Sequence, residues 1–164
     1  MPADQPGSPG ADARWLVAAI GLSRQCPPSP SAFSVGAVLV GADGAVIATG
    51  YSRETSPADH AEEVALVKVT SAGQPPGSAA AVPDLGTATM YSSLEPCAAR
   101  ASRPRTCAEL IIAAGIRRVV FAWREPPLFV PGGGAAVLTA AGVTVTELPE
   151  LADAARAVNA HLDR

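Results

Sequence analysis

The chain has 164 residues, of which 48% are apolar and 16% charged, and its formal net charge is −3. This composition is typical of one globular domain with a substantial core, and it excludes a disordered chain. The negative charge and the 4% of aromatic residues argue against a nucleic-acid partner, because sequence-tolerant binding of a strand requires basic and aromatic surface.

The first ten residues are rich in Pro, Gly and Ser, so we expect a disordered tail over residues 1–10 and a single domain over 11–164. The tail lacks the basic start and apolar run of a secretory signal. The apolar stretches at 35–41 and 110–116 are too short to cross a bilayer. We therefore expect a cytoplasmic protein with no membrane partner.

The hydrophobic pattern predicts ten elements in the order α-β-β-α-β-α-β-α-β-α. The helices are expected at residues 11–25, 59–68, 107–116, 135–142 and 149–163, and the strands at 33–40, 45–51, 87–94, 117–123 and 143–148. The first two strands are joined by "GADG", which signals a hairpin, and helices between the later strands imply parallel crossovers. The predicted fold class is therefore α/β, a three-layer α/β/α sandwich around a five-stranded mixed sheet.

The predicted helix that begins near Asp59 carries one of the two histidines of the chain. In the stretch "DHAEEVALVK", Asp59 can cap the helix, and the acidic residues suit its first turn. Taken alone, His60 would be read as a surface or capping residue rather than as a ligand. The other histidine, His161, lies in the terminal helix and is expected to face solvent.

Two cysteines lie where they can complete a metal site with this histidine. Pro96-Cys97 follows the third predicted strand, and Cys107 is expected to begin the next helix, where the helix dipole favours a thiolate. One imidazole and two thiolates are a suitable ligand set for Zn²⁺, with the fourth position left to water. In a reducing compartment no disulfide is expected, and Cys26 is expected to be buried as a small apolar residue.

Glu62 is expected to move protons rather than to bind the metal. Two residues after His60, its carboxylate can take a proton from water and return it to a leaving amine. This order of residues fits the zinc deaminase signature, H-x-E followed by P-C-x-x-C. The sequence departs from the signature because nine residues, rather than two, separate Cys97 from Cys107. The intervening loop must therefore fold back.

At these residues the chain resembles the cytidine deaminase-like superfamily, and most closely the pyrimidine deaminases of riboflavin biosynthesis, over residues 13–147. The stretches similar to the fungal-type deaminase domain of that pathway are "AFSVG" at 32–36, "GYSRE" at 50–54, "HAE" at 60–62 and "EPCAAR" at 95–100. The fungal-type pattern also has nine residues between its cysteines. Bacterial members have an Asn before V-G, where this chain has Ala32.

The resemblance implies that Glu62 is the proton shuttle and that His60, Cys97 and Cys107 hold one Zn²⁺ per chain. It implies a hydrolase of the C–N bonds of cyclic amidines, with a diaminopyrimidinone carrying a ribityl or ribosyl phosphate as substrate. Superfamily members are usually dimers or tetramers, so we expect a homodimer or homotetramer. The reductase of the pathway is expected to be a separate protein.

The expected substrate contacts come from the first and third strands and from the loop between the cysteines. They are Phe33, Ser34, Ser93, Glu95, Arg100, Arg103 and Arg105. Arginine is well shaped to fork onto a phosphate, so one or two of the three are expected to bind it. The alternative is that they form a solvated basic loop. The strand residues are expected to line the pocket or meet the ring.

Two other functions fit the same residues. A deaminase of deoxycytidylate, cytidine, cytosine or guanine would share every catalytic residue, so only the pocket distinguishes it. A zinc-binding module without catalysis would have no need of Glu62, and it would normally close the fourth metal position with a protein ligand.

Overall fold

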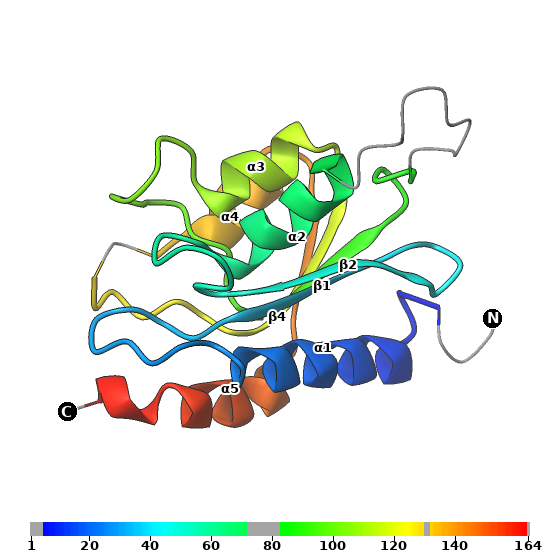
Figure 1. The fold of residues 1–164 in the computed structure, drawn as a ribbon. Helices are drawn as coiled ribbons and strands as arrows, with labels where there is room; N and C mark the ends of the chain where they lie inside the picture. Colours follow the sequence, from blue (N-terminus) through cyan, green and yellow to red (C-terminus); the bar gives the residue numbers. More distant parts are fainter. Residues whose placement is uncertain (1–4, 72–82, 130–131, 164) are drawn as a thin grey trace.

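The computed structural model describes residues 5–71, 83–129 and 132–163 (Figure 1). Most of the loop predicted at 71–86, and the first four residues of the predicted tail, lie outside the described residues. The first helix begins at Pro9, two residues before its expected start at residue 11. It starts there because the Ser8 side chain accepts a hydrogen bond from the backbone N–H of Ala11 and so caps it.

The described elements follow the predicted order. The helices are α1 (Pro9–Ser23), α2 (Ala61–Ser71), α3 (Cys107–Ala113), α4 (Gly134–Ala140) and α5 (Ala152–Val158), with 3₁₀ turns η1 (Pro149–Leu151) and η2 (Ala160–Leu162). The strands are β1 (Gly36–Val40), β2 (Val46–Tyr51), β3 (Thr89–Leu94), β4 (Arg118–Trp123) and β5 (Thr144–Glu147). In the part of the chain that is described, no helix is long and apolar enough to span a membrane.

The five strands form one mixed sheet in the order β2-β1-β3-β4-β5. Strand β1 is antiparallel to both β2 and β3, whereas β3, β4 and β5 are parallel to one another. Helices α1 and α5 cover one face of the sheet, and α2, α3 and α4 cover the other (Figure 1). The predicted three-layer sandwich is therefore confirmed.

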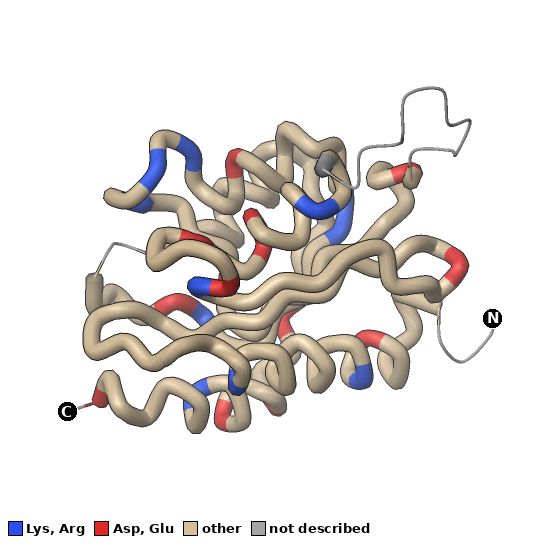
Figure 2. The backbone as a smooth tube through the Cα atoms, viewed as in Figure 1, with Lys and Arg blue, Asp and Glu red and all other residues tan. Residues whose placement is uncertain are grey.

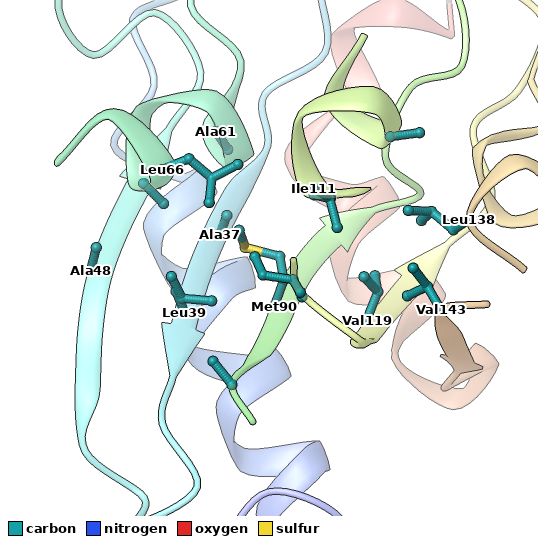
Figure 3. Packing of buried hydrophobic residues seen from close by; sticks show 14 of the residues in the cluster. Ala37, Leu39, Ala48, Ala61, Leu66, Met90, Ile111, Val119, Leu138 and Val143 are labelled. Atoms are coloured by element: carbon teal, nitrogen blue, oxygen red, sulfur yellow. The ribbon is translucent and has the colours of Figure 1, made fainter. Parts of the chain in front are cut away.

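Each face of the sheet carries its own apolar core. Leu39, Met90 and Val119 are paired across three neighbouring strands and are completely buried on the side of α2, α3 and α4. There they pack in one cluster with Ile111 and Leu138 (Figure 3). The next residue of each strand points to the opposite face, toward α1 and α5. The central strands are thus buried on both faces, which is why they lack a polar side.

The topology gathers several loops at one edge of the sheet. The carboxyl ends of β3 and β4 lie together there, and the backbone N–H of Glu95 donates to the carbonyl oxygen of Trp123. Because β1 runs antiparallel to β3, β1 begins at this same edge and β2 ends there. In open α/β sheets, the carboxyl ends of parallel strands are where ligands bind.

Candidate metal centre and active site

His60, Cys97 and Cys107 lie together at this edge. The Nδ1 atom of His60 is 3.5 Å from Sγ of Cys97 and 3.4 Å from Sγ of Cys107. All three potential ligand atoms lie within 4.8 Å of one another. Zinc bonds of about 2.3 Å to sulfur and about 2.0 Å to nitrogen, at tetrahedral angles, separate S and N by roughly 3.5 Å. Both the donor set and its spacing therefore fit a zinc ion.

Local structure brings the two cysteines to the histidine. Cys107 is the first residue of α3, and its backbone N–H donates to Sγ of Cys97 at 3.3 Å. Thr106 caps this helix in a reciprocal capping box with Glu109. The prediction that α3 begins at Cys107 is therefore confirmed. His60 immediately precedes α2, so both helices start at the cluster.

The two thiols differ in acidity. Hydrogen bonds from Cys107 and then from His60 lower the pKa of Cys97. The hydrogen bond to Cys97, together with complete burial, raises the pKa of Cys107 well above its ordinary value. A bound metal requires the thiolate form of both residues.

Glu62 lies in the first turn of α2 and is only 3% exposed. The hydroxyl of Ser92 donates to its Oε1 atom at 2.8 Å. Burial, followed by the negative charge of Cys97, raises the pKa of Glu62. Ser92 was not among the predicted site residues, although a polar side chain in the middle of a fully buried strand was a signal for it.

The long loop between the cysteines folds back because its arginines pair with acids beside His60. The Arg100 side chain is 1% exposed and contacts the Glu63 carboxylate through both terminal nitrogens, at 3.3 and 3.1 Å. It also donates to the carbonyl oxygen of Ala58 at 2.6 Å. Arg103 contacts Glu63 at 3.2 Å. Figure 2 shows the basic residues gathered on this loop, between β3 and α3.

Asp59 takes part in these ion pairs of the loop and does not cap α2. Its carboxylate accepts hydrogen bonds from the backbone N–H groups of Thr55 and Ser56 and from the Thr55 hydroxyl. It also pairs with Arg103 at 3.1 Å. The expectation that Asp59 caps the helix is therefore wrong, because the preceding turn uses its oxygens.

These contacts bear on the expected phosphate site. Arg100 and Arg103 are committed to acids and carbonyls of the fold, so their geometry lends no support to a phosphate role for either. Arg105 is exposed. The alternative of a loosely solvated basic loop also fails for Arg100, since its guanidinium is buried.

A pocket of about 290 Å³ opens beside the metal cluster. His60, Glu62 and Cys97 form part of its wall. Phe33 also lines the pocket, as expected, and its ring packs edge-on against Trp123 and Phe129 at centroid distances of 5.6 and 5.4 Å. The pocket wall therefore includes both residues of the metal cluster and aromatic side chains.

Two expected pocket residues have structural roles instead. The backbone of Ser34 exchanges hydrogen bonds with the Asn159 side chain, and its hydroxyl accepts from Arg53. The Ser93 hydroxyl accepts from the backbone N–H of Gly36. Neither serine lines the pocket, so the geometry lends no support to the expected contact of either with the substrate. Ser93 lies in β3, whereas Ser34 precedes β1, and both side chains are buried.

Glu95 lines the pocket, but its carboxylate is already occupied. Oε1 accepts the backbone N–H of Glu125 at 3.1 Å, and Oε2 accepts that of Ala135 at 2.9 Å. Glu95 thus ties the loop after β4 and the start of α4 to the end of β3. Its contribution at this site is to hold two backbone segments in place.

The pocket residues that the sequence analysis did not name include Arg53, Glu125 and Phe129. Glu95 directly follows the end of β3, and Glu125 lies two residues after the end of β4, so the parallel pairing of these strands was an available signal. Arg53 has φ of 60° and donates to the carbonyl oxygens of Pro27 and Phe33. No local sequence pattern predicts these contacts of Arg53.

The remaining histidine and cysteine lie outside the metal cluster. His161 lies in η2 and is exposed, as expected. Cys26 is only half-buried, and its thiol contacts the carbonyl oxygen of Val35 at 3.4 Å. Its expected burial is therefore incomplete.

Comparison with known proteins gives a consistent picture. Residues 10–123 match the family model described as the cytidine and deoxycytidylate deaminase zinc-binding region. The resemblance drawn from the sequence motifs is therefore confirmed. A diaminohydroxyphosphoribosylamino-pyrimidine deaminase of Schizosaccharomyces pombe is 37% identical over 133 residues, which cover 81% of this chain and 31% of that protein.

Two further similarities span most of the chain. The riboflavin biosynthesis protein RibD of Actinobacillus pleuropneumoniae is 33% identical over 156 residues, which cover 92% of this chain and 37% of that protein. The crystal structure of Aspergillus oryzae Rib2 deaminase superposes with a TM-score of 0.71 at 28% identity, covering 93% of this chain and 99% of that one. The chain thus spans about a third of the two curated relatives.

Proposed function

Because the chain belongs to the cytidine and deoxycytidylate deaminase family, we propose that it is a zinc-dependent hydrolase that releases ammonia from an aminopyrimidine. The observation that carries this proposal is the His60–Cys97–Cys107 cluster with a buried carboxylate, Glu62, on the wall of the same pocket. In this proposal one Zn²⁺ is held by the imidazole and the two thiolates. A zinc ion in such a site supplies Lewis acidity, through which water becomes a nucleophile near neutral pH.

In the proposed mechanism, Glu62 handles the protons. Its carboxylate takes a proton from the attacking water and delivers it to the substrate, so that the amino group leaves as ammonia. The Ser92 hydroxyl holds one carboxylate oxygen, which orients Glu62. Burial raises the pKa of Glu62 and so brings it nearer to that of a group that both accepts and returns a proton at neutral pH.

The substrate we propose is the diaminopyrimidinone of riboflavin biosynthesis, carrying a ribityl or ribosyl phosphate. The name of the Schizosaccharomyces pombe relative and the extent of the similarity to the Aspergillus oryzae Rib2 deaminase support this choice. The aromatic wall around Phe33 is suited to a flat heterocycle. We further propose that the chain acts in the cytoplasm as a homodimer or homotetramer. The exposed apolar side chains of Val67 on α2 and Val137 on α4 support an interface between copies of the chain.

A substrate panel tests this function. Ammonia release is measured with the ribityl and ribosyl forms of the diaminopyrimidinone phosphate, deoxycytidylate, cytidine, cytosine and guanine, together with the zinc content of the protein. We expect turnover of a diaminopyrimidinone, about one zinc per chain, and loss of turnover when a chelator removes the metal. Turnover of another substrate alone would contradict the pathway proposal, and turnover unaffected by metal removal would contradict the zinc mechanism.

A further inference from the structure

Glu125 is a pocket residue that the proposed mechanism does not use. It follows β4 at the edge of the sheet where the site lies and forms part of the pocket wall with His60 and Glu62. Its Oε2 atom is buried, and no described residue donates a hydrogen bond to it. A buried carboxylate oxygen without a donor is costly, so its partner is to be sought in what the pocket binds.

The backbone N–H of Glu125 is hydrogen-bonded, whereas one oxygen of its carboxyl group is unpaired among the described residues. Its N–H donates to Oε1 of Glu95, whose other oxygen holds the start of α4. Burial, followed by the charges of Cys97, Glu62 and Glu95, raises the pKa of Glu125 to about 8. A hydrogen bond donated to this carboxyl group by a bound molecule has the opposite effect, because it favours the charged carboxylate. Among the described residues, the fold therefore leaves one oxygen of this carboxyl group without a hydrogen-bond partner, as expected of a binding group rather than a structural one.

Two other roles for Glu125 are less consistent with its position. It is not part of the group of side chains close enough to share a metal ion with His60, so it is not a fourth ligand. The proton-transfer role already has a candidate in Glu62, which directly follows the histidine motif and is oriented by Ser92. A hydrogen-bond acceptor for the substrate is the role that remains.

We infer that Glu125 is a specificity-determining residue whose carboxylate accepts a hydrogen bond from an N–H group of the substrate other than the amino group that leaves. This inference rests on the proposed function. The diaminopyrimidinone carries such groups on the ring, on a second amino group and at the link to the sugar. A cytosine nucleoside has no N–H apart from the amino group that is lost. Glu125 therefore favours the diaminopyrimidinone over cytosine-type substrates.

The test compares Glu125→Ala, Glu125→Gln and the wild type, with Glu150→Gln as a control because Glu150 is exposed on η1. We measure kcat and KM for the diaminopyrimidinone phosphate and for deoxycytidylate, and the zinc content of each protein. Losing a hydrogen bond to a charged group predicts that Glu125→Ala raises KM for the diaminopyrimidinone roughly 10- to 100-fold. Its kcat, its zinc content and its efficiency on deoxycytidylate should stay within about threefold of the wild type.

Several results would overturn the inference: an unchanged KM, a loss confined to kcat, or a loss of zinc in a folded Glu125→Ala protein. If that variant does not fold, the nearly isosteric Glu125→Gln decides, with an expected rise in KM of roughly 3- to 10-fold.

The wild type separates this inference from the proposed function. A wild type that acts on guanine but not on the pyrimidinones refutes the proposed substrate, and the same KM comparison is then made with guanine, which keeps a ring N–H. A wild type restricted to cytosine-type substrates refutes both the proposed function and the role of Glu125.

Discussion

At the scale of single residues, the proposed chemistry separates into metal binding and proton transfer. His60, Cys97 and Cys107 form the cluster, whereas Glu62 lies outside it and contacts Ser92. Removing the charge of Glu62 should therefore affect turnover without affecting the metal.

We predict that Glu62→Gln retains the zinc content of the wild type and loses at least about 100-fold in kcat, the usual contribution of general acid–base catalysis. Gln keeps the shape of the side chain and an acceptor for the Ser92 hydroxyl, so the fold should persist. Steady-state kinetics and metal analysis on the same preparation measure both effects. Full activity in this variant would remove Glu62 from the mechanism, and loss of zinc would make it a ligand.

At the scale of secondary-structure elements, close approach of backbones positions the metal site. The start of α4 lies against the segment of Pro96 and Cys97, and a Cβ atom added at Gly134 would overlap the carbonyl oxygen of Pro96. Glu95 binds the backbone N–H of Ala135 in the same place. A larger residue at Gly134 must therefore push α4 away from the segment that holds Cys97.

We predict that Gly134→Ala lowers the free energy of unfolding by about 1–3 kcal/mol, as overpacking does, and weakens zinc retention. The matched control is Gly21→Ala in α1, where an added Cβ meets nothing within 4 Å. Because Ala suits a helix interior better than Gly, this control should be neutral or stabilising by up to about 1 kcal/mol. Denaturant titrations and zinc analysis compare the two variants. Equal free energies of unfolding would contradict the prediction, because α4 could then shift away from Pro96 without cost.

At the scale of the whole molecule, a buried polar cluster joins the first helix to the centre of the sheet. Asp12 of α1 accepts hydrogen bonds from the Tyr91 hydroxyl of β3 at 2.6 Å and from both terminal nitrogens of Arg118 of β4, at 2.9 and 2.6 Å. The cluster lies on the face opposite α2, so it bears on stability and not on the site.

This cluster predicts a pH dependence of stability. Burial raises the pKa of Asp12, but hydrogen bonds from Arg118 and Tyr91 outweigh it, so the net pKa lies below its ordinary value of 3.8. A carboxylate with a lowered folded-state pKa stabilises the fold above its unfolded pKa, and this contribution is lost as pH falls through the folded value.

Asp12→Asn should therefore cost about 1–3 kcal/mol at neutral pH, a value reduced for the partial exposure of Arg118. The difference from the wild type should shrink as the pH falls below 3.8. Urea denaturation at several pH values measures it, with the exposed Asp163→Asn as control. A difference that does not depend on pH would assign the effect to packing rather than to charge.

The sequence alone determined the order of the elements and the residues of the metal cluster. Period-two and helical patterns are local, so the strands and helices, including the start of α3 at Cys107, could be read from neighbouring residues. The histidine and cysteine motifs likewise named the side chains that lie together, because few residue types offer such ligands.

Only the tertiary structure decided how the other polar side chains are used. Ser34 and Ser93 are held by distant backbone and side-chain groups, and Arg100 is paired with Glu63, 37 positions earlier. Such partners depend on the loop that folds back and on strand register, which no local pattern encodes. Glu125 differs from these residues, because the parallel pairing of β3 and β4 is enough to place it beside Glu95 at the pocket.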